Sequence, residues 1–151
     1  MKSGSEREHT NSLIGQTFAT LLSCQQKLSY NISRAMKVFD ITRQQYEVLA
    51  ILNDHSKQPM NLNKVKSYLR ENVPDISRIV QRLVEKGLIN RSRQENDRRN
   101  SAISINDDGK ALIVQIEPII KEKMSEFFGI LTSEELHELS RIISKVNKNK
   151  A

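Results

Sequence analysis

The stretch RIVQRLVEKGLINRSRQENDRRNSAISI, residues 78–105, joins a helical pattern to two alternating segments. Its first residues keep the apolar spacing of a helix, and Gly87 fits the left-handed position that commonly ends helices. The segments LINRSR and SAISI flank the polar QENDRRN and have the pattern of two short strands. This stretch therefore predicts a helix followed by a β-hairpin with a long, charged tip.

Positive charge is concentrated in the same stretch. Residues 78–99 hold seven Lys and Arg against three Asp and Glu, which is four of the chain's six net positive charges. On a chain with a sequence pI of about 9.5, such a cluster is typical of proteins that bind polyanions. The alternative is a solvated helix face, and clustering alone does not decide between the two.

Length and composition limit the classes of protein to which the chain could belong. A chain of 151 residues fits one domain, or one domain with extended arms, and can bury a substantial core. It has no apolar run near the ~20 residues that a membrane-spanning helix needs. The first residues, MKSGSEREHTNS, lack the apolar segment of a signal peptide. Together with the single cysteine, which excludes an intramolecular disulfide framework, this predicts a cytoplasmic protein.

Three helices are predicted before the opening stretch. Residues 10–37 have the periodicity of a long amphipathic helix. Thr42 and Gln45 form a capping box at the start of TRQQYEVLAIL, whose buried stripe is Tyr46, Leu49 and either Leu52 or Ile51. The third helix is short and has Asn61 as its cap. Its inward residues are Leu62, Val65 and Leu69, and its outward residues are Lys64, Lys66 and Arg70.

The fourth predicted helix has two distinct faces. Pro74 is acceptable in its first turn, where a backbone N–H would lack a partner. The apolar stripe is Ile76, Ile79, Val80, Leu83 and Val84, and the opposite face presents Ser77, Arg78, Gln81, Arg82 and Glu85. A short helix, a turn, a second helix with an Arg/Gln/Ser face and a basic hairpin follow the order of a winged helix-turn-helix.

Several of these segments resemble the MarR family of bacterial transcriptional regulators. ITRQQYEVL, ISRIVQRLVEKGLINR, DRR and IND with Gly109 match that family in order and spacing from about Ile41 to Leu112. Asn106 departs from the family's usual Thr, but Asn caps a helix about as well. The resemblance implies a mainly α fold with a small β-hairpin wing. It divides the chain into an N-terminal dimerisation helix (1–38), a DNA-binding lobe (39–108) and C-terminal dimerisation helices (109–151).

The resemblance also implies a homodimer in which the first helix and the last two pack against a second copy. The apolar pattern of the C-terminal helices independently predicts a partner. Residues 110–128 predict a long helix with a bend at Pro118, and Thr132 with Glu135 opens a last helix through a second capping box. These terminal apolar stripes exceed what one winged helix can cover. The predicted interface comprises Leu13, Phe18, Leu136, Leu139, Ile143 and Val146.

A symmetric dimer would place two copies of the fourth helix in successive major grooves about 34 Å apart, on an imperfect palindrome. Arg78 and Arg82 are predicted to contact guanine or phosphate, Gln81 to contact adenine, and Ser77 to contact either kind of site. Lys64 and Lys66 are predicted to contact phosphates.

The hairpin tip supplies a further predicted contact. Arg98 or Arg99 would enter the minor groove, where narrow A·T-rich tracts concentrate negative potential, and we favour Arg99. By resemblance, Asp97 holds an arginine of the wing in place and does not touch DNA.

The sequence gives little indication of a metal site, a catalytic site or a reactive thiol. His9, His55 and His137 are scattered without a second ligand at metal spacing, and no nucleophile, phosphate-loop or dinucleotide motif is present. We therefore predict no metal, no cofactor and no enzymatic activity. Some MarR-type proteins sense peroxide through an N-terminal cysteine, but Cys24 lies on the stripe of Leu21 and Leu28 and is predicted to be a packed, inert thiol.

The sequence thus predicts a dimeric, ligand-responsive repressor whose small-molecule effector binds between the dimer arms and the DNA-binding lobes. One alternative is a winged-helix protein-interaction module that meets an acidic partner. Another is a redox-sensing regulator that uses Cys24.

Overall fold

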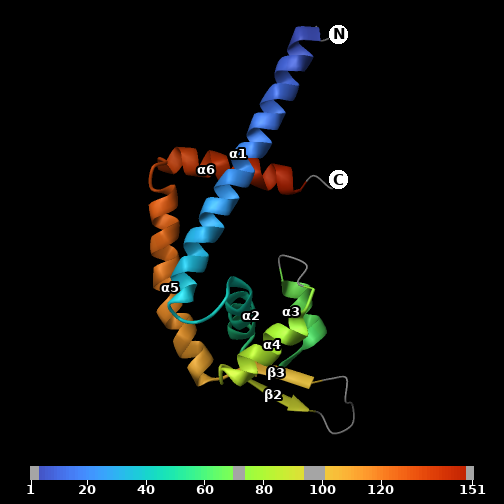
Figure 1. Cartoon of the computed structure of the whole chain (residues 1–151), viewed down its shortest axis with the longest axis vertical. Helices are drawn as coiled ribbons and strands as arrows, with labels where there is room; N and C mark the ends of the chain where they lie inside the picture. The colour runs from blue at the N-terminus through green and yellow to red at the C-terminus, as the bar shows by residue number, and fades with distance from the viewer. Residues whose placement is uncertain (1–3, 70–73, 94–100, 149–151) are drawn as a thin grey trace. The chain divides into compact units, whose positions relative to one another are not determined.

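A computed structural model describes residues 4–69, 74–93 and 101–148, and these ranges contain six helices and three strands (Figure 1). The helices and strands follow in the order α1 Gly4–Lys37, α2 Arg43–Asp54, β1 Met60–Asn61, α3 Leu62–Tyr68, α4 Ile76–Glu85, β2 Ile89–Arg93, β3 Ser101–Ile105, α5 Asp107–Phe128 and α6 Ser133–Asn147.

The chain divides into two compact units. The winged-helix lobe comprises Ile32–Ile120, and the terminal unit comprises Met1–Asn31 with Lys121–Ala151. Helices α1 and α5 contribute residues to both units. The division into 1–38, 39–108 and 109–151 concerns the roles of the segments and stays a prediction.

The lobe contains an antiparallel sheet with the strand order β1-β3-β2. Strands β2 and β3 pair from Ile89 opposite Ile105 to Arg93 opposite Ser101, which confirms the predicted hairpin (Figure 1). Strand β1 was not predicted. It pairs Met60 with Ile103 and ties the entrance of α3 to the wing.

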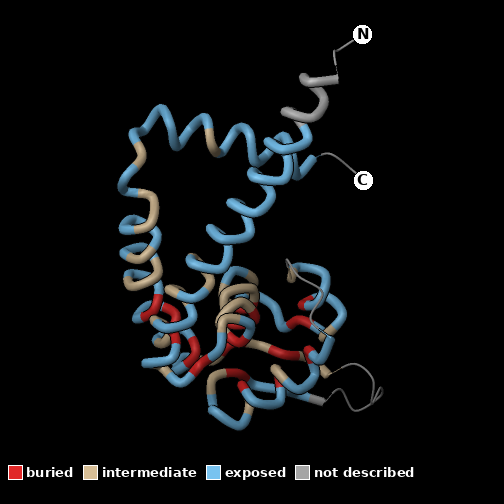
Figure 2. Tube along the Cα trace, turned by 45° about the horizontal axis from the view of Figure 1, so that its top comes forward, coloured by how far each residue is buried: buried red, intermediate tan, exposed pale blue. Residues whose placement is uncertain are grey.

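A hydrophobic core lies within the lobe. Helix α2 packs against α3, α4 and β3, and α4 also packs against β2. Figure 2 shows the buried segments of the lobe in red. The buried hydrophobic residues are Met36, Ile41, Val48, Leu49, Leu52, Met60, Val65, Ile76, Val80, Leu83, Ile89, Ile103, Ile105, Ile113 and Ile116.

The terminal unit differs from the lobe, because none of its described residues is a buried hydrophobic one. Of the predicted dimer-interface residues, Leu139 is partly buried and the other five are exposed in the single chain. The other exposed large hydrophobic residues of this unit are Ile14, Leu21, Leu22, Tyr30, Met124, Ile130 and Ile142.

Cys24 is exposed in the single chain, so the prediction that its thiol is packed is wrong there. The physical reason is that the stripe to which it was assigned is itself uncovered at Leu21, 48% exposed. Periodicity identified the apolar face of α1 but not whether anything within the same chain covers it.

Local signals in the sequence placed the starts of α2, α3 and α6 correctly, whereas α1 begins at Gly4 and α5 at Asp107, before the predicted residues 10 and 110. Both capping boxes are present, from Thr42 with Gln45 and from Thr132 with Glu135. Asn61 caps α3 by accepting a hydrogen bond from the backbone N–H of Lys64. The placement of Pro74 in the first turn of α4 was wrong. Pro74 precedes the helix, because the carboxylate of Asp75 caps it by accepting from the N–H of Arg78 at 3.0 Å.

The hydrophobicity of the helices was compared with that of membrane-spanning helices. Within the described ranges, none of the helices combines the length and the apolar character needed to cross a membrane.

Candidate nucleic-acid interface

Helix α4 presents a polar face because its apolar face is anchored in the lobe. Ile76, Val80 and Leu83 are buried, with Val80 and Leu83 completely inaccessible to solvent. Since these positions recur every three or four residues, they fix the rotation of the helix about its axis. The side chains on the other face are exposed, and they include all four predicted DNA contacts of this helix, Ser77, Arg78, Gln81 and Arg82.

The end of α4 is held in a fixed relation to the wing. Gly87 has a φ of 69°, which glycine adopts without strain. Asn106 then bridges two elements, because its Nδ2 donates to the carbonyl of Gly87 at 2.7 Å while its Oδ1 accepts from the N–H of Gly109 at 2.9 Å. Asn106 therefore caps α5 and also binds the turn after α4.

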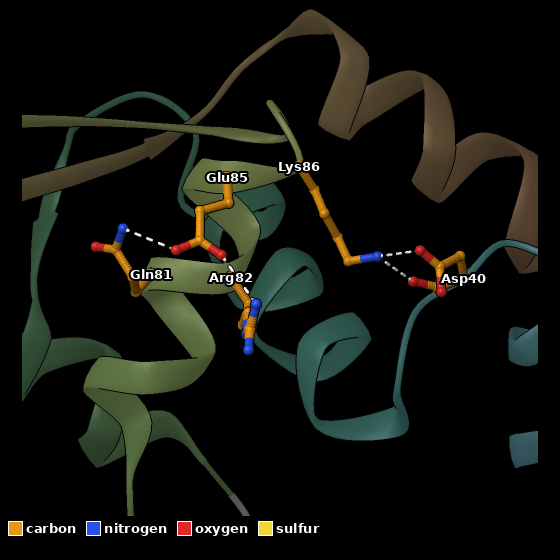
Figure 3. A network of polar contacts seen from close by, with 5 residues as sticks. All are labelled: Asp40, Gln81, Arg82, Glu85 and Lys86. Atoms are coloured by element: carbon orange, nitrogen blue, oxygen red, sulfur yellow. Dashed lines mark hydrogen bonds and ion pairs between the residues drawn. The ribbon is translucent and has the colours of Figure 1, made fainter.

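A polar network lies on the exposed face of α4 (Figure 3). The carboxylate of Glu85 accepts hydrogen bonds from Gln81 and from Arg82, each at 3.2 Å. The sequence placed Glu85 on this face but did not assign it a role. The signal was available in the spacing, since residues three and four apart on a helix are neighbours.

Two shallow hollows adjoin α4 in the lobe, with volumes of about 340 and 370 Å³. Arg82, Thr42 and Gln45 line both of them, whereas Arg78 lines the first and Lys86 lines the second. The structure thus brings the arginines of α4 beside the N-terminus of α2, an arrangement that the sequence did not predict.

The remaining predicted contacts fall in two groups. Lys64 and Lys66 are exposed on α3, and neither lines either hollow. Asp97, Arg98 and Arg99 lie outside the described residues. Their roles stay predictions.

Among the residues of the lobe that the structure describes, Asp40 and Tyr46 have shifted pKa values. A hydrogen bond from Lys86, reinforced by its charge, lowers the pKa of Asp40 below its usual value. Burial, reinforced by the charges of Glu117 and Asp54, raises the pKa of Tyr46. Tyr46 therefore keeps its phenolic proton at neutral pH.

His55 and His137 make local contacts. The Nδ1 atom of His55 lies 2.9 Å from the carbonyl of Ile51, and its ring lies 4.5 Å from the ring of Tyr68. In His137, Nδ1 lies 2.7 Å from the carbonyl of Ser133. The described part of the chain has no cluster of three His, Cys, Asp or Glu side chains able to hold a metal ion.

Comparison with known proteins identifies the family. Residues 41–101, which span α2, β1, α3, α4 and β2 and end at the first residue of β3, match the model of the MarR family. This segment of the chain is therefore a MarR-family region. The MarR family consists of DNA-binding transcriptional regulators and is not a family of enzymes.

Solved structures of MarR proteins share the fold over most of the chain. A MarR-like protein from Bacillus cereus has a TM-score of 0.83 at 18% identity, covering 93% of this chain and 99% of its own. A cysteine-to-serine mutant of MarR from E. coli, complexed with operator DNA, has a TM-score of 0.76 at 23% identity, with 90% and 96% covered. BpsR of Bordetella bronchiseptica, whose DNA binding is regulated by 6-hydroxynicotinic acid, has a TM-score of 0.77 at 21% identity, with 88% and 99% covered.

Proposed function

We propose that this MarR protein is a homodimeric repressor that binds a palindromic operator and is released by a small molecule. The observation that carries the proposal is the outer face of α4, where Arg78, Gln81 and Arg82 are exposed on a helix anchored by a buried stripe. These side-chain types read the edges of guanine and adenine in the major groove. A rigidly seated helix keeps them in register with successive base pairs.

Charge supports a polyanionic partner. The outer face of α4 carries two arginines, and Lys64 and Lys66 add exposed positive charge on α3. Arginine suits base edges and phosphates through its planar donors, whereas lysine acts as a point charge on phosphates. We therefore assign base contacts to Arg78, Gln81 and Arg82, base or phosphate contacts to Ser77, and phosphate contacts to the two lysines.

The wing completes the proposed interface. Arg99, or alternatively Arg98, would enter the minor groove beside the operator's half-site, with Asp97 restraining an arginine of the wing. This part of the proposal rests on the sequence and on the resemblance to the family, since the tip lies outside the described residues.

The proposed dimer rests on the uncovered terminal unit. Phe18 and Val146 are each 62% exposed, and Leu13 is 56% exposed. Several large apolar side chains exposed in one unit are typical of an interaction surface. A second copy related by a two-fold axis would cover it and would supply the second reading helix that a palindrome requires.

Release by a small molecule is proposed because BpsR, which has the same fold, has its DNA binding regulated by 6-hydroxynicotinic acid.

A selection experiment tests the proposal. The full-length protein is used to enrich duplexes from a pool with a randomised centre. The most enriched duplex and a scrambled duplex are then titrated with the protein across a range of salt concentrations. We expect an inverted repeat with half-site centres about 10 base pairs apart and an affinity that falls steeply with salt. Polyglutamate serves as the competitor. If no sequence were enriched and polyglutamate displaced all duplexes equally, the protein-interaction alternative would replace the proposal.

A further inference from the structure

Glu85 is a negative charge among the side chains that we assign to the DNA interface. Its Oε1 accepts a hydrogen bond from Nε2 of Gln81 and its Oε2 accepts one from Nη1 of Arg82, both at 3.2 Å (Figure 3). One carboxylate thus engages the neighbours three and four residues before it on the outer face of α4.

A carboxylate in this place opposes DNA binding in general. Phosphates along both strands repel it whatever the base sequence is, so it lowers affinity for every duplex. It also contributes little to folding, because the side chains of Arg82 and Glu85 are 58% and 48% exposed. Neither general affinity nor stability therefore accounts for an acidic residue here.

The network leaves hydrogen-bonding groups of Gln81 and Arg82 available for bases. Gln81 uses one of its two amide hydrogens on Glu85 and keeps the second hydrogen and its carbonyl oxygen, which is the pair that adenine requires. Arg82 uses one of five donors and keeps enough for the two acceptors of guanine. Glu85 can therefore restrain both side chains without consuming their capacity to read bases.

We propose that Glu85 is a positioning residue that determines sequence specificity, because it restrains Gln81 and Arg82 toward base edges and disfavours duplexes that offer only phosphate contacts. The inference rests on the proposed DNA-reading role of α4. Without Glu85, Arg82 would be free to pair with a phosphate on any sequence, and the charge opposing such binding would be gone.

The test compares full-length wild-type protein with Glu85→Gln, which removes the charge at nearly constant size. Affinity is measured for the operator enriched by the wild type and for a scrambled duplex, across a salt titration. We expect affinity for the scrambled duplex to rise about two- to fivefold, the effect of one exposed ion pair. The salt slope should steepen by about one, as for one added phosphate contact. The ratio of operator to scrambled affinity should fall.

A matched control separates position from net charge. Glu126→Gln makes the same change in an exposed ion pair with Lys123, at 2.7 Å, in the terminal unit. It should leave the ratio and the slope at wild-type values. Glu85→Ala, which also removes both hydrogen bonds, should lower the ratio at least as far as Glu85→Gln.

Two results would overturn the inference. One is an unchanged ratio and slope in both Glu85 variants. The other is loss of operator affinity with unchanged scrambled affinity, which would make Glu85 a direct base contact, as carboxylates are to cytosine. Failure of the proposed function would look different, because the wild-type protein would then enrich no operator at all.

Discussion

Lys86, at the C-cap of α4, donates hydrogen bonds to both the backbone carbonyl and the carboxylate of Asp40. Asp40 precedes α2 and has a φ of 53°, a conformation that Asp tolerates better than most residues. The contact joins residues 46 apart in sequence, so it links the segment between α1 and α2 to the end of α4 (Figure 3).

This contact predicts a pH dependence of stability. Because Lys86 lowers the pKa of Asp40 in the folded state, ionised Asp40 stabilises the fold above its unfolded pKa of about 3.9. That contribution is lost as the pH falls through the lower, folded-state pKa. At pH 7 we expect the wild-type protein to have a higher melting temperature than Asp40→Asn. This difference in melting temperature should shrink below about pH 4.

A double-mutant cycle with Lys86→Met isolates the pair from other carboxylates. In the Lys86→Met background, Asp40→Asn should have little effect at any pH. A melting difference that stayed constant from pH 7 to pH 3 would contradict the assignment.

Gly109 predicts a steric effect at the junction of wing and α5. A Cβ atom there would lie 2.2 Å from the carbonyl oxygen of Leu88 and 2.7 Å from Cγ1 of Ile105, so the backbone must shift. We expect Gly109→Ala to lower the free energy of unfolding by about 1–3 kcal/mol, measured by urea denaturation. Gly15→Ala has no neighbour within 4 Å and should raise it by about 0.5–1 kcal/mol. If both substitutions changed the free energy of unfolding by the same amount, the predicted clash of a Cβ atom at Gly109 would be contradicted.

These contacts also mark how far the sequence could predict the structure. Capping boxes and the left-handed Gly87 depend on residues a few positions apart, so local spacing predicted them. The wing strands pair residues 8 to 16 positions apart, but each strand has its own alternating pattern, which the sequence shows. The network of Gln81, Arg82 and Glu85 was equally local and could have been predicted. Strand β1 was missed because two residues carry no periodicity, and Met60 becomes a strand only by pairing with Ile103.

Long-range features were beyond the sequence. The bond between Asp40 and Lys86 and the approach of Leu88 to Gly109 depend on how elements pack. Cys24 illustrates the same limit, since an apolar stripe shows which face of a helix is hydrophobic but not what covers it. The exposure of the candidate residues on α4 was predictable, because the buried stripe of a regular helix determines which residues lie on its outer face.

The proposed dimer makes a prediction at Ile143, which is 39% exposed in the single chain. Ile143→Glu would bury an unpaired charge at the interface, at a cost of several kcal/mol. We expect monomers in light scattering and loss of operator binding. Lys145→Glu changes charge on another side of α6 and should leave the dimer intact. A fully active dimer of Ile143→Glu would remove this residue from the interface.

Cys24 allows a test of the redox alternative. The chain has no second cysteine with which it could form an intramolecular disulfide. We expect operator affinity to be unaffected by peroxide in wild-type protein and in Cys24→Ser alike. Loss of binding on oxidation of the wild type, with Cys24→Ser resistant, would instead establish a thiol switch.

The central claim is that the outer face of α4 reads base sequence, and a binding profile of Arg82→Ala tests it most directly. Affinities for every single-base variant of the operator are measured for wild type, Arg82→Ala and Lys64→Ala. Arg82→Ala should lose about 1–3 kcal/mol and its preference at one base position in each half-site. Lys64→Ala should weaken all duplexes equally and reduce the salt slope by about one. Wild-type preferences at every position in Arg82→Ala would contradict the assignment of this face to sequence reading.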